Sequence, residues 1–251
     1  MAEEQTQSTR FGLSSFVLKI IALLTMTADH IGYLLFPSET WLRIIGRLAF
    51  PIFAFVLAEG CRFTKHPLRR FLTIAVLGVI CEIVYDIYSQ SFYGNILLQL
   101  SFSVGLLMLL KESKKGFFGE TPDYAKGWIF LFLFGVGIAG TAVFCHYLSL
   151  DYGFVGVLVP VIVGIVDFKG TRPPEFLSAL DNFIVRLFLL AFALMLLCIQ
   201  PTSASYQPWC FLALVPIALY NGKAGKIKLK YFFYLYYPLH LLAIAGIAML
   251  L

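Results

Sequence analysis

Long apolar runs, separated by short polar segments, follow one another along almost the whole chain of 251 residues. A bilayer core of about 30 Å needs about 20 helical residues to cross it, and nine runs come near that length. They lie at residues 16–36, 41–61, 71–88, 94–110, 127–146, 152–166, 183–200, 209–220 and 231–251. The pattern predicts an all-α fold, a polytopic transmembrane helical bundle of about nine spans, whose short eighth run either crosses or is a re-entrant or tilted piece.

Basic residues indicate how these runs are oriented, because cytoplasmic loops of membrane proteins carry an excess of Lys and Arg. With the N-terminus placed in the cytoplasm, the inner segments hold 17 of the 19 Lys and Arg residues, and only Arg43 and Arg47 fall toward the outer side. No small-residue cleavage site follows a short apolar core, so we expect the first run to be an uncleaved helix. Residues 1–15 are then a cytoplasmic tail, and residues 16–251 form a single transmembrane domain.

Composition agrees with a membrane protein and argues against binding of nucleic acid or metal. Hydrophobic residues make up 60% of the chain and charged residues 13%, whereas soluble domains carry about 25% charged residues. The net charge of +5 follows the predicted topology and indicates no nucleic-acid partner. The His and Cys residues stand singly, without CxxC or HExxH spacing, so we expect no metal site. Cys198 and Cys210 flank one predicted outer loop, either as a disulfide or as two unpaired apolar cysteines.

Ionisable residues interrupt the first two apolar runs, where such groups are costly and usually mark a functional interior. At 1.5 Å per helical residue, His30 lies about 21 Å from the inner boundary, while Glu82 and Asp86 lie at about 17 and 23 Å. We call the residues expected near this depth the outer layer: Asp29, His30, Arg43, Arg47, Glu82, Asp86 and Gln99. The pairs spaced i, i+4 place their polar groups on one face of a helix, which should point into a shared cavity rather than into lipid.

A second polar group is expected nearer to the cytoplasm. Glu59 ends the second run, and Tyr237 and His240 lie about 9–14 Å up the last helix. The segment CRFTKHPLRR begins two residues after Glu59 and adds four basic residues on the inner side, Arg62, Lys65, Arg69 and Arg70. We call these seven residues the inner layer.

Each of these groups also has a purely structural interpretation. Arg47 with Glu82 or Asp86 is then a buried salt bridge that fixes helix packing. Asp29 then serves only to orient a structural His30. His240 follows Pro238 closely and then satisfies backbone groups that the proline leaves free.

Two functional interpretations remain open from the residues alone. A neutral His30 imidazole can act as a general base toward an attacking amine or hydroxyl, with a carboxylate such as Asp29 fixing its tautomer. Alternatively, a proton-coupled membrane transporter can use a proton relay made of Asp29, His30, Glu82 and Asp86.

Two adjacent stretches, LKIIALLTMTADHIGYLLFP and LRIIGRLAFPIFAFVLAEGCRFT, resemble the TraX family of conjugal-transfer membrane proteins. The later segments CEIVYDI, DYGFVGVLVPVIV and FYLYYPLHLL are similar to the family's remaining blocks, so the resemblance covers about residues 18–242. The best-known member acetylates the N-terminus of F-type pilin. The family is also similar to transmembrane acyltransferases of the acyltransferase-3 and heparan glucosaminide acetyltransferase types. There, a membrane histidine near the first helix is the key catalytic group, and acyl-CoA is used from the cytosol.

The resemblance implies a multi-pass acyltransferase of the bacterial inner (cytoplasmic) membrane, with acetyl-CoA or another acyl-CoA as donor and no metal. The acceptor is an amine or hydroxyl on a peptide such as a pilin N-terminus, on a glycan or on a lipid headgroup. The resemblance implicates His30, with Asp29 beside it and Arg47 in the next block, as catalytic residues. Glu82 and Asp86 join these candidates because of their expected depth in the outer layer. Basic side chains suit the phosphates of CoA, and the implied donor site is the inner layer: Glu59, Arg62, Lys65, Arg69, Arg70, Tyr237 and His240.

Overall fold

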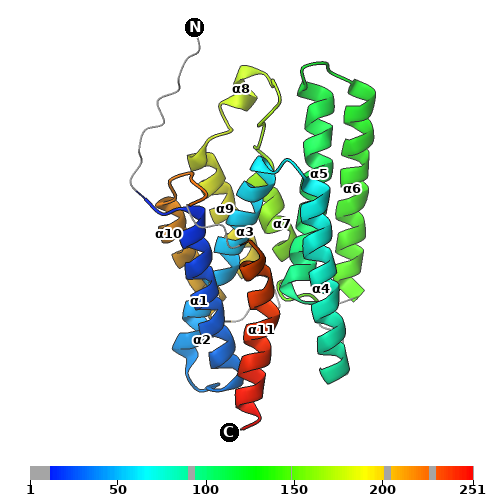
Figure 1. The fold of residues 1–251 in the computed structure, drawn as a ribbon. Helices are drawn as coiled ribbons and strands as arrows, with labels where there is room; N and C mark the ends of the chain where they lie inside the picture. The colour runs from blue at the N-terminus through cyan, green and yellow to red at the C-terminus, as the bar shows by residue number, and fades with distance from the viewer. Residues whose placement is uncertain (1–11, 90–93, 148, 201–204, 226–229, 251) are drawn as a thin grey trace.

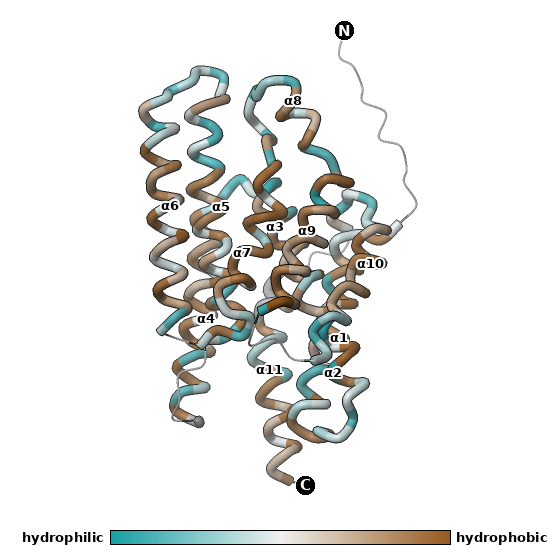
Figure 2. Tube along the Cα trace, turned by 180° about the vertical axis from the view of Figure 1, so that it is seen from behind, coloured by the Kyte–Doolittle hydropathy of each residue, from teal (hydrophilic) through white to brown (hydrophobic). Residues whose placement is uncertain are grey.

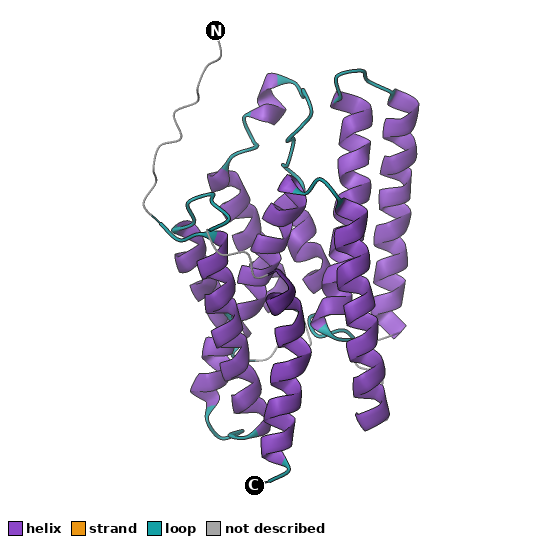
Figure 3. Cartoon of the chain, in the orientation of Figure 1, coloured by secondary structure: helices purple, strands orange, loops and turns teal. Residues whose placement is uncertain are grey.

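A computed structural model describes residues 12–89, 94–147, 149–200, 205–225 and 230–250, and the regular elements in these ranges are all helices. Figures 1 and 3 show how they are arranged in space. The helices are α1 (Ser15–Leu34), α2 (Thr40–Gly46), α3 (Ala49–Phe63), α4 (Pro67–Ser89), α5 (Ile96–Phe118), α6 (Tyr124–Tyr147), α7 (Gly153–Gly164), α8 (Glu175–Ser178), α9 (Phe183–Cys198), the 3-10 helix η1 (Gln207–Ala213), α10 (Leu214–Ala218) and α11 (Lys230–Ala248). The all-α prediction is confirmed.

Four helical stretches in the described residues are long and apolar enough to cross a membrane: Ser15–Leu34, Thr40–Phe63, Ile96–Phe118 and Tyr124–Tyr147. Shorter apolar helices occupy Gly153–Gly164, Phe183–Cys198, Gln207–Ala218 and Leu235–Ala248. These helices are those of a membrane protein, while the count of nine spans and the cytoplasmic N-terminus stay predictions. Figure 2 shows apolar residues along the helices and polar residues gathered at the α5–α6 loop and near α8.

Two of the predicted spans are built differently from a continuous helix. The second run divides into α2 and α3, with Arg47 and Leu48 at the junction. The eighth run becomes η1 followed by α10, which together hold 12 residues, 207–218. At 1.5–2.0 Å per residue this pair reaches about 18–24 Å. It is therefore too short to cross a 30 Å core as a regular helix, in agreement with the re-entrant or tilted alternative.

Local sequence signals explain where several helices begin. The hydroxyl of Ser14 accepts from Val17 N and starts α1. Asn95 accepts from two backbone amides at the start of α5, and Asn182 accepts from Val185 N at the start of α9. These caps satisfy amides that have no partner within the helix.

The main core lies where α1, α3, α5, α7 and α9 meet, while α6 stands at the edge of the bundle beside α5 (Figure 1). α11 packs along α1 and extends past the α1–α2 turn, at the end of the bundle opposite to α8. A long-range aromatic contact supports this seam, since Phe16 and Phe233 place their ring centroids 5.9 Å apart. The seam brings the first and last helices of the chain together.

Two glycines allow α1 and α2 to approach closely. A Cβ atom at Gly32 would lie 2.7 Å from the Cβ of Leu42, and a Cβ atom at Gly46 would overlap the side chain of Asp29. Membrane helices commonly use small residues for such close packing. The glycine on α2 therefore makes the space in which the Asp29 carboxylate lies.

Cys198 and Cys210, for which the sequence allowed either a disulfide or two free thiols, are unpaired in this structure. Their Sγ atoms lie 3.7 Å apart, one at the end of α9 and the other in η1, and both thiols are free. Of the two alternatives for Cys198 and Cys210, the structure has the pair of apolar thiols.

Candidate functional site

Asp29 on α1 is held between two arginines of the α2 segment. Its Oδ2 accepts from Arg43 Nη1 at 2.7 Å, and its Oδ1 accepts from Arg47 Nη2 at 2.6 Å. Arg43 Nη1 also donates to the backbone carbonyl of Asp29 at 3.1 Å. The i, i+4 spacing of the two arginines presents both guanidiniums to one helix. We call these three residues the Arg–Asp–Arg cluster.

The segment that leads into η1 closes this cluster from another side. The hydroxyl of Tyr206 accepts from Arg43 Nη2 at 3.3 Å, and Gln207 Oε1 accepts from Arg47 Nη1 at 3.3 Å. The Tyr206 ring lies 5.2 Å from the guanidinium carbon of Arg47, within the range of a cation–π contact. Sequence analysis missed Tyr206 and Gln207, because no spacing or charge pattern marks them in the segment PTSASYQPW.

His30, the neighbour of Asp29 on α1, pairs with a histidine from the far end of the chain. His30 Nδ1 lies 3.0 Å from His240 Nε2 on α11. His240 Nδ1 in turn lies 2.9 Å from the backbone carbonyl oxygen of Tyr236. The hydroxyls of Thr27 and Tyr236, at 2.7 Å, make a second polar contact along the same seam.

This chain of contacts assigns the protons on the neutral histidine pair. A carbonyl oxygen only accepts, so His240 Nδ1 carries the proton of that bond and His240 Nε2 is left with a lone pair. His30 Nδ1 must then donate to His240, which leaves the lone pair of His30 on Nε2. Asp29 was expected to fix this tautomer, but both of its carboxylate oxygens bond to arginine. His240 and the backbone carbonyl of Tyr236 fix the tautomer of His30 instead.

The position of His240 corrects the prediction of two separate layers. Counting residues placed His240 near the cytoplasm, whereas it contacts His30 directly. Counting assumes that a helix begins level with the others, but α11 is displaced toward the α1–α2 end of the bundle (Figure 1). Tyr237 accompanies it, with its ring centroid 5.8 Å from that of His240. The backbone bond of His240 goes to Tyr236 and not to the carbonyl four residues before Pro238.

Glu82 and Asp86 do not join the Arg–Asp–Arg cluster by an ion pair in the described residues. The buried Glu82 accepts from the backbone amide of Asn95 at 3.1 Å and from its side-chain amide at 2.9 Å, linking α4 to the start of α5. Asp86 is exposed. Gln99 is fully buried, and its Oε1 accepts from the backbone amide of Tyr152. The expected salt bridge from Arg47 to Glu82 or Asp86 is replaced by the bond to Asp29.

Two of the seven residues of the inner layer, Glu59 and Arg62, are engaged in ion pairs. Glu59 pairs with Arg186 of α9, and Arg62 pairs with both Asp167 and Asp181. These bonds join the end of α3 to the segments around α8 and neutralise Arg62. The remaining basic residues of the segment are Lys65 and Arg69, which are exposed, and Arg70, which is partly buried.

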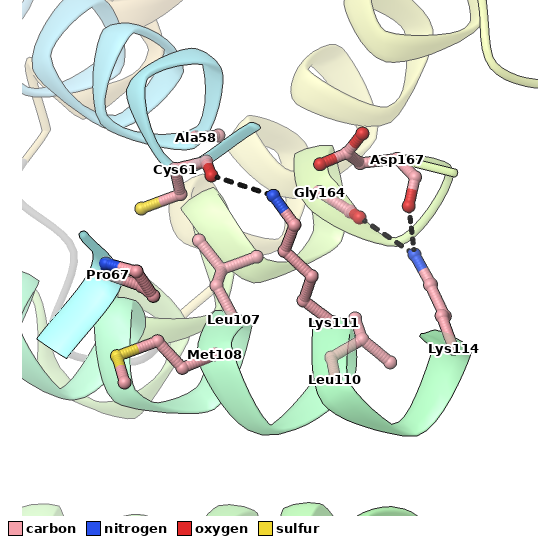
Figure 4. A pocket seen from close by; sticks show the side chains of 10 residues that line it. All are labelled: Ala58, Cys61, Pro67, Leu107, Met108, Leu110, Lys111, Lys114, Gly164 and Asp167. Carbon is pink, nitrogen blue, oxygen red and sulfur yellow. Dashed lines mark hydrogen bonds between the residues drawn. The ribbon is translucent and has the colours of Figure 1, made fainter. Parts of the chain in front are cut away.

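Two cavities lie at this end of the bundle. One of about 20 Å³ lies between α3, α5 and α7, beside Lys111 and Lys114 (Figure 4). Lys114 donates to the backbone carbonyls of Gly164, Ile165 and Asp167 at 2.7–3.2 Å and so holds the end of α7. This cavity has room for about one water molecule. The other cavity, of about 160 Å³, is lined by Glu59, Arg62, Phe63, Phe183, Arg186, Tyr220, Asn221 and Gly222.

The model of the TraX protein family matches residues 14–248. A probable fimbrial assembly protein FimC of Dichelobacter nodosus is 24% identical over 97% of this chain and 99% of its own length. An uncharacterized protein of Rickettsia prowazekii is 37% identical over 62% of this chain, and the match spans 57% of that protein. The protein TraX of Escherichia coli is 32% identical over 36% of this chain and 38% of its own. No solved structure matches.

Proposed function

We propose a function for this chain, which belongs to the TraX family. The protein acts as an acyl-CoA-dependent acyltransferase that moves an acetyl or other acyl group to an amine or hydroxyl. His30 is the general base. The observation that carries the proposal is the contact between His30 Nδ1 and His240 Nε2. It assigns the lone pair of His30 to Nε2, on the residue next to the arginine-paired Asp29.

The proposed reaction transfers the acyl group from the thioester of acyl-CoA to the acceptor, and His30 carries the proton from the acceptor to the leaving thiolate. The acceptor attacks the thioester carbonyl carbon while His30 Nε2 takes the proton from its amine or hydroxyl. The carbonyl oxygen becomes an oxyanion, which the guanidinium of Arg47 stabilises. The C–S bond then breaks, and the thiolate of CoA takes the proton back from His30. No metal takes part in this scheme.

For the donor, we assign the CoA phosphates to the exposed side chains of Lys65 and Arg69, together with Arg70. Arg62 is better suited to a structural role, because two carboxylates already neutralise it. The 160 Å³ cavity that Glu59 lines offers an entrance beside this basic segment. We no longer assign His240 to the donor site, because it contacts His30 and positions that base.

The name of one relative supports an acceptor connected with pili, since that relative is a probable fimbrial assembly protein. The resemblance to the TraX family points the same way, because the best-known member acetylates a pilin N-terminus. The acceptors to test are therefore a pilin-like peptide N-terminus, glycans and lipid headgroups. A proton relay of the transporter kind is less well supported, because Asp29 is occupied by two arginines and Asp86 is exposed.

The test uses the full-length protein in lipid nanodiscs with radiolabelled acetyl-CoA, following release of free CoA and label on the acceptor. We expect turnover by the wild type and a loss of about 1,000-fold in His30→Ala, within the range of general-base catalysis. His66→Ala is the matched control, since His66 is exposed and should leave turnover unchanged. Lack of acyl-CoA binding and turnover in the wild type, or equal turnover in His30→Ala, overturns the proposal.

A further inference from the structure

The Arg–Asp–Arg cluster carries more positive charge than its own carboxylate neutralises. Arg43 and Arg47 both pair with Asp29, and no other carboxylate of the described residues forms an ion pair with either arginine. One positive charge therefore remains. A charge at membrane depth is costly unless it finds a partner, so the surplus charge favours the binding of an anion there.

A hydrogen-bond donor in the same cluster is also unused. The residue Arg47 is only 8% exposed, and its Nε has no hydrogen-bond partner among the described residues. A buried donor without a partner costs free energy, so its presence indicates a group that completes the site. Guanidinium groups suit phosphate oxygens, which accept several N–H bonds in parallel.

Exposed apolar side chains lie around the more open side of the cluster. Arg43 is the more open of the two arginines, with 18% of its side chain exposed, and its guanidinium lies 5.0 Å from the ring centroid of Tyr33. Tyr33 itself is 64% exposed. Large apolar side chains around the α1–α2 turn are exposed as well, namely Leu34, Phe36, Trp41 and Ile45. Tyr and Trp are typical of the membrane–water interface.

From these observations we infer that Arg43 and Arg47 bind the phosphate of an anionic membrane amphiphile that enters beside Tyr33 and Trp41. The apolar tail lies along the exposed side chains of the α1–α2 end, and the headgroup reaches the cluster. Because Asp29 and His30 are neighbours on α1, a hydroxyl or amine of the headgroup comes close to the base. That the amphiphile is the acyl acceptor rests on the proposed function, whereas its binding does not.

The experiment measures lipid binding without any acyl donor. Delipidated protein is titrated with phosphatidylglycerol, and bound lipid is counted by native mass spectrometry, with diacylglycerol as the probe that lacks the phosphate. We expect phosphatidylglycerol to bind more tightly than diacylglycerol, and Arg43→Gln to weaken its binding about fivefold to tenfold. Arg172→Gln is the matched control. Arg172 lies in the segment before α8 and pairs with Glu120, and both side chains are at least 76% exposed.

A second variant keeps the inference testable if Arg43→Gln disturbs the fold. Asp29→Asn removes the internal counter-charge, so it should strengthen the preference for phosphatidylglycerol over diacylglycerol. Equal binding of the two lipids by the wild type overturns the inference, as does equal phosphatidylglycerol binding by wild type and Arg43→Gln. Displacement of the lipid by an acidic peptide at lower concentration also overturns it, in favour of a peptide site. Intact lipid binding without acetyl transfer contradicts only the proposed function.

Discussion

Two groups of charged residues lie at opposite ends of the bundle, and they differ in how their charges are balanced. At the α3–α4 end, Arg62 is shared by two aspartates and Glu59 pairs with Arg186. At the α1–α2 end, two arginines share the single carboxylate of Asp29. Among the residues of these ion pairs, the first group has at least one carboxylate for every guanidinium, and the second has an arginine in excess. Lys65, Arg69 and Arg70, to which we assign the CoA phosphates, do not belong to the first group.

This difference separates a structural network from a site with capacity to bind. Arg62 Nε lacks a hydrogen-bond partner, as Arg47 Nε does, but the charge of Arg62 is already covered. The α3–α4 network joins α3, α9 and the segment around α8, so its loss should loosen the fold. The Arg–Asp–Arg cluster lies beside a histidine with a free lone pair, so its loss should affect chemistry first.

Replacing one arginine in each group tests most directly whether the two groups have different roles. We expect Arg47→Gln to lower acetyl transfer by about 100-fold to 1,000-fold, as the loss of an oxyanion donor does. Arg62→Gln leaves Asp167 and Asp181 without their cation and should cost about 3 kcal/mol of stability. Turnover per folded protein and melting temperature in nanodiscs measure the two effects. Transfer that falls only in Arg62→Gln would reverse the assignment of the two groups.

Replacement of His240 tests whether this residue orients His30 at the α1–α2 end. His240→Ala removes the acceptor that orients His30, and we expect kcat to fall about 100-fold with KM unchanged. His240→Gln offers an amide oxygen in place of Nε2 and should restore much of kcat. The pH profile of kcat/KM provides the second measurement. Wild-type activity should rise with pH as His30 loses its proton, since only the neutral imidazole is a base.

A structural role alone gives a different result for His240. In that case, the Ala and Gln variants would lower the melting temperature to different extents, while the pH profile of the folded enzyme would keep the wild-type shape.

The smallest expected effect concerns the packing that places Asp29. Gly46→Ala puts a methyl group into the space of the Asp29 side chain, and we expect it to cost about 2 kcal/mol. Gly140→Ala on α6 is the matched control, because a Cβ atom there meets nothing within 4 Å. Thermal melting in nanodiscs compares the two. Equal melting temperatures would show that α1 and α2 have room to move apart.

Local spacing predicted which residues of the first two apolar runs share a layer, whereas the packing of the helices decided their contacts. Arg43 and Arg47 share a face because they are one helical turn apart, and the helical hairpin brings them to Asp29, so residue counting placed them correctly. His240 is 210 residues from His30, and its height depends on how α11 slides along α1. That slide is set by packing at the seam, which leaves no periodic signal in the sequence.

The all-helical, apolar character of this protein follows from the order of its residues, and so does the shared layer of the polar residues in the first two apolar runs. Helical periodicity and hydropathy are local properties, so they can be read along the chain. The bonds of Asp29 to arginines, of His30 to His240 and of Glu82 to Asn95 depend on how the helices pack. A buried polar group takes whichever partner the packed helices bring within reach, and that choice exists only once the bundle is assembled.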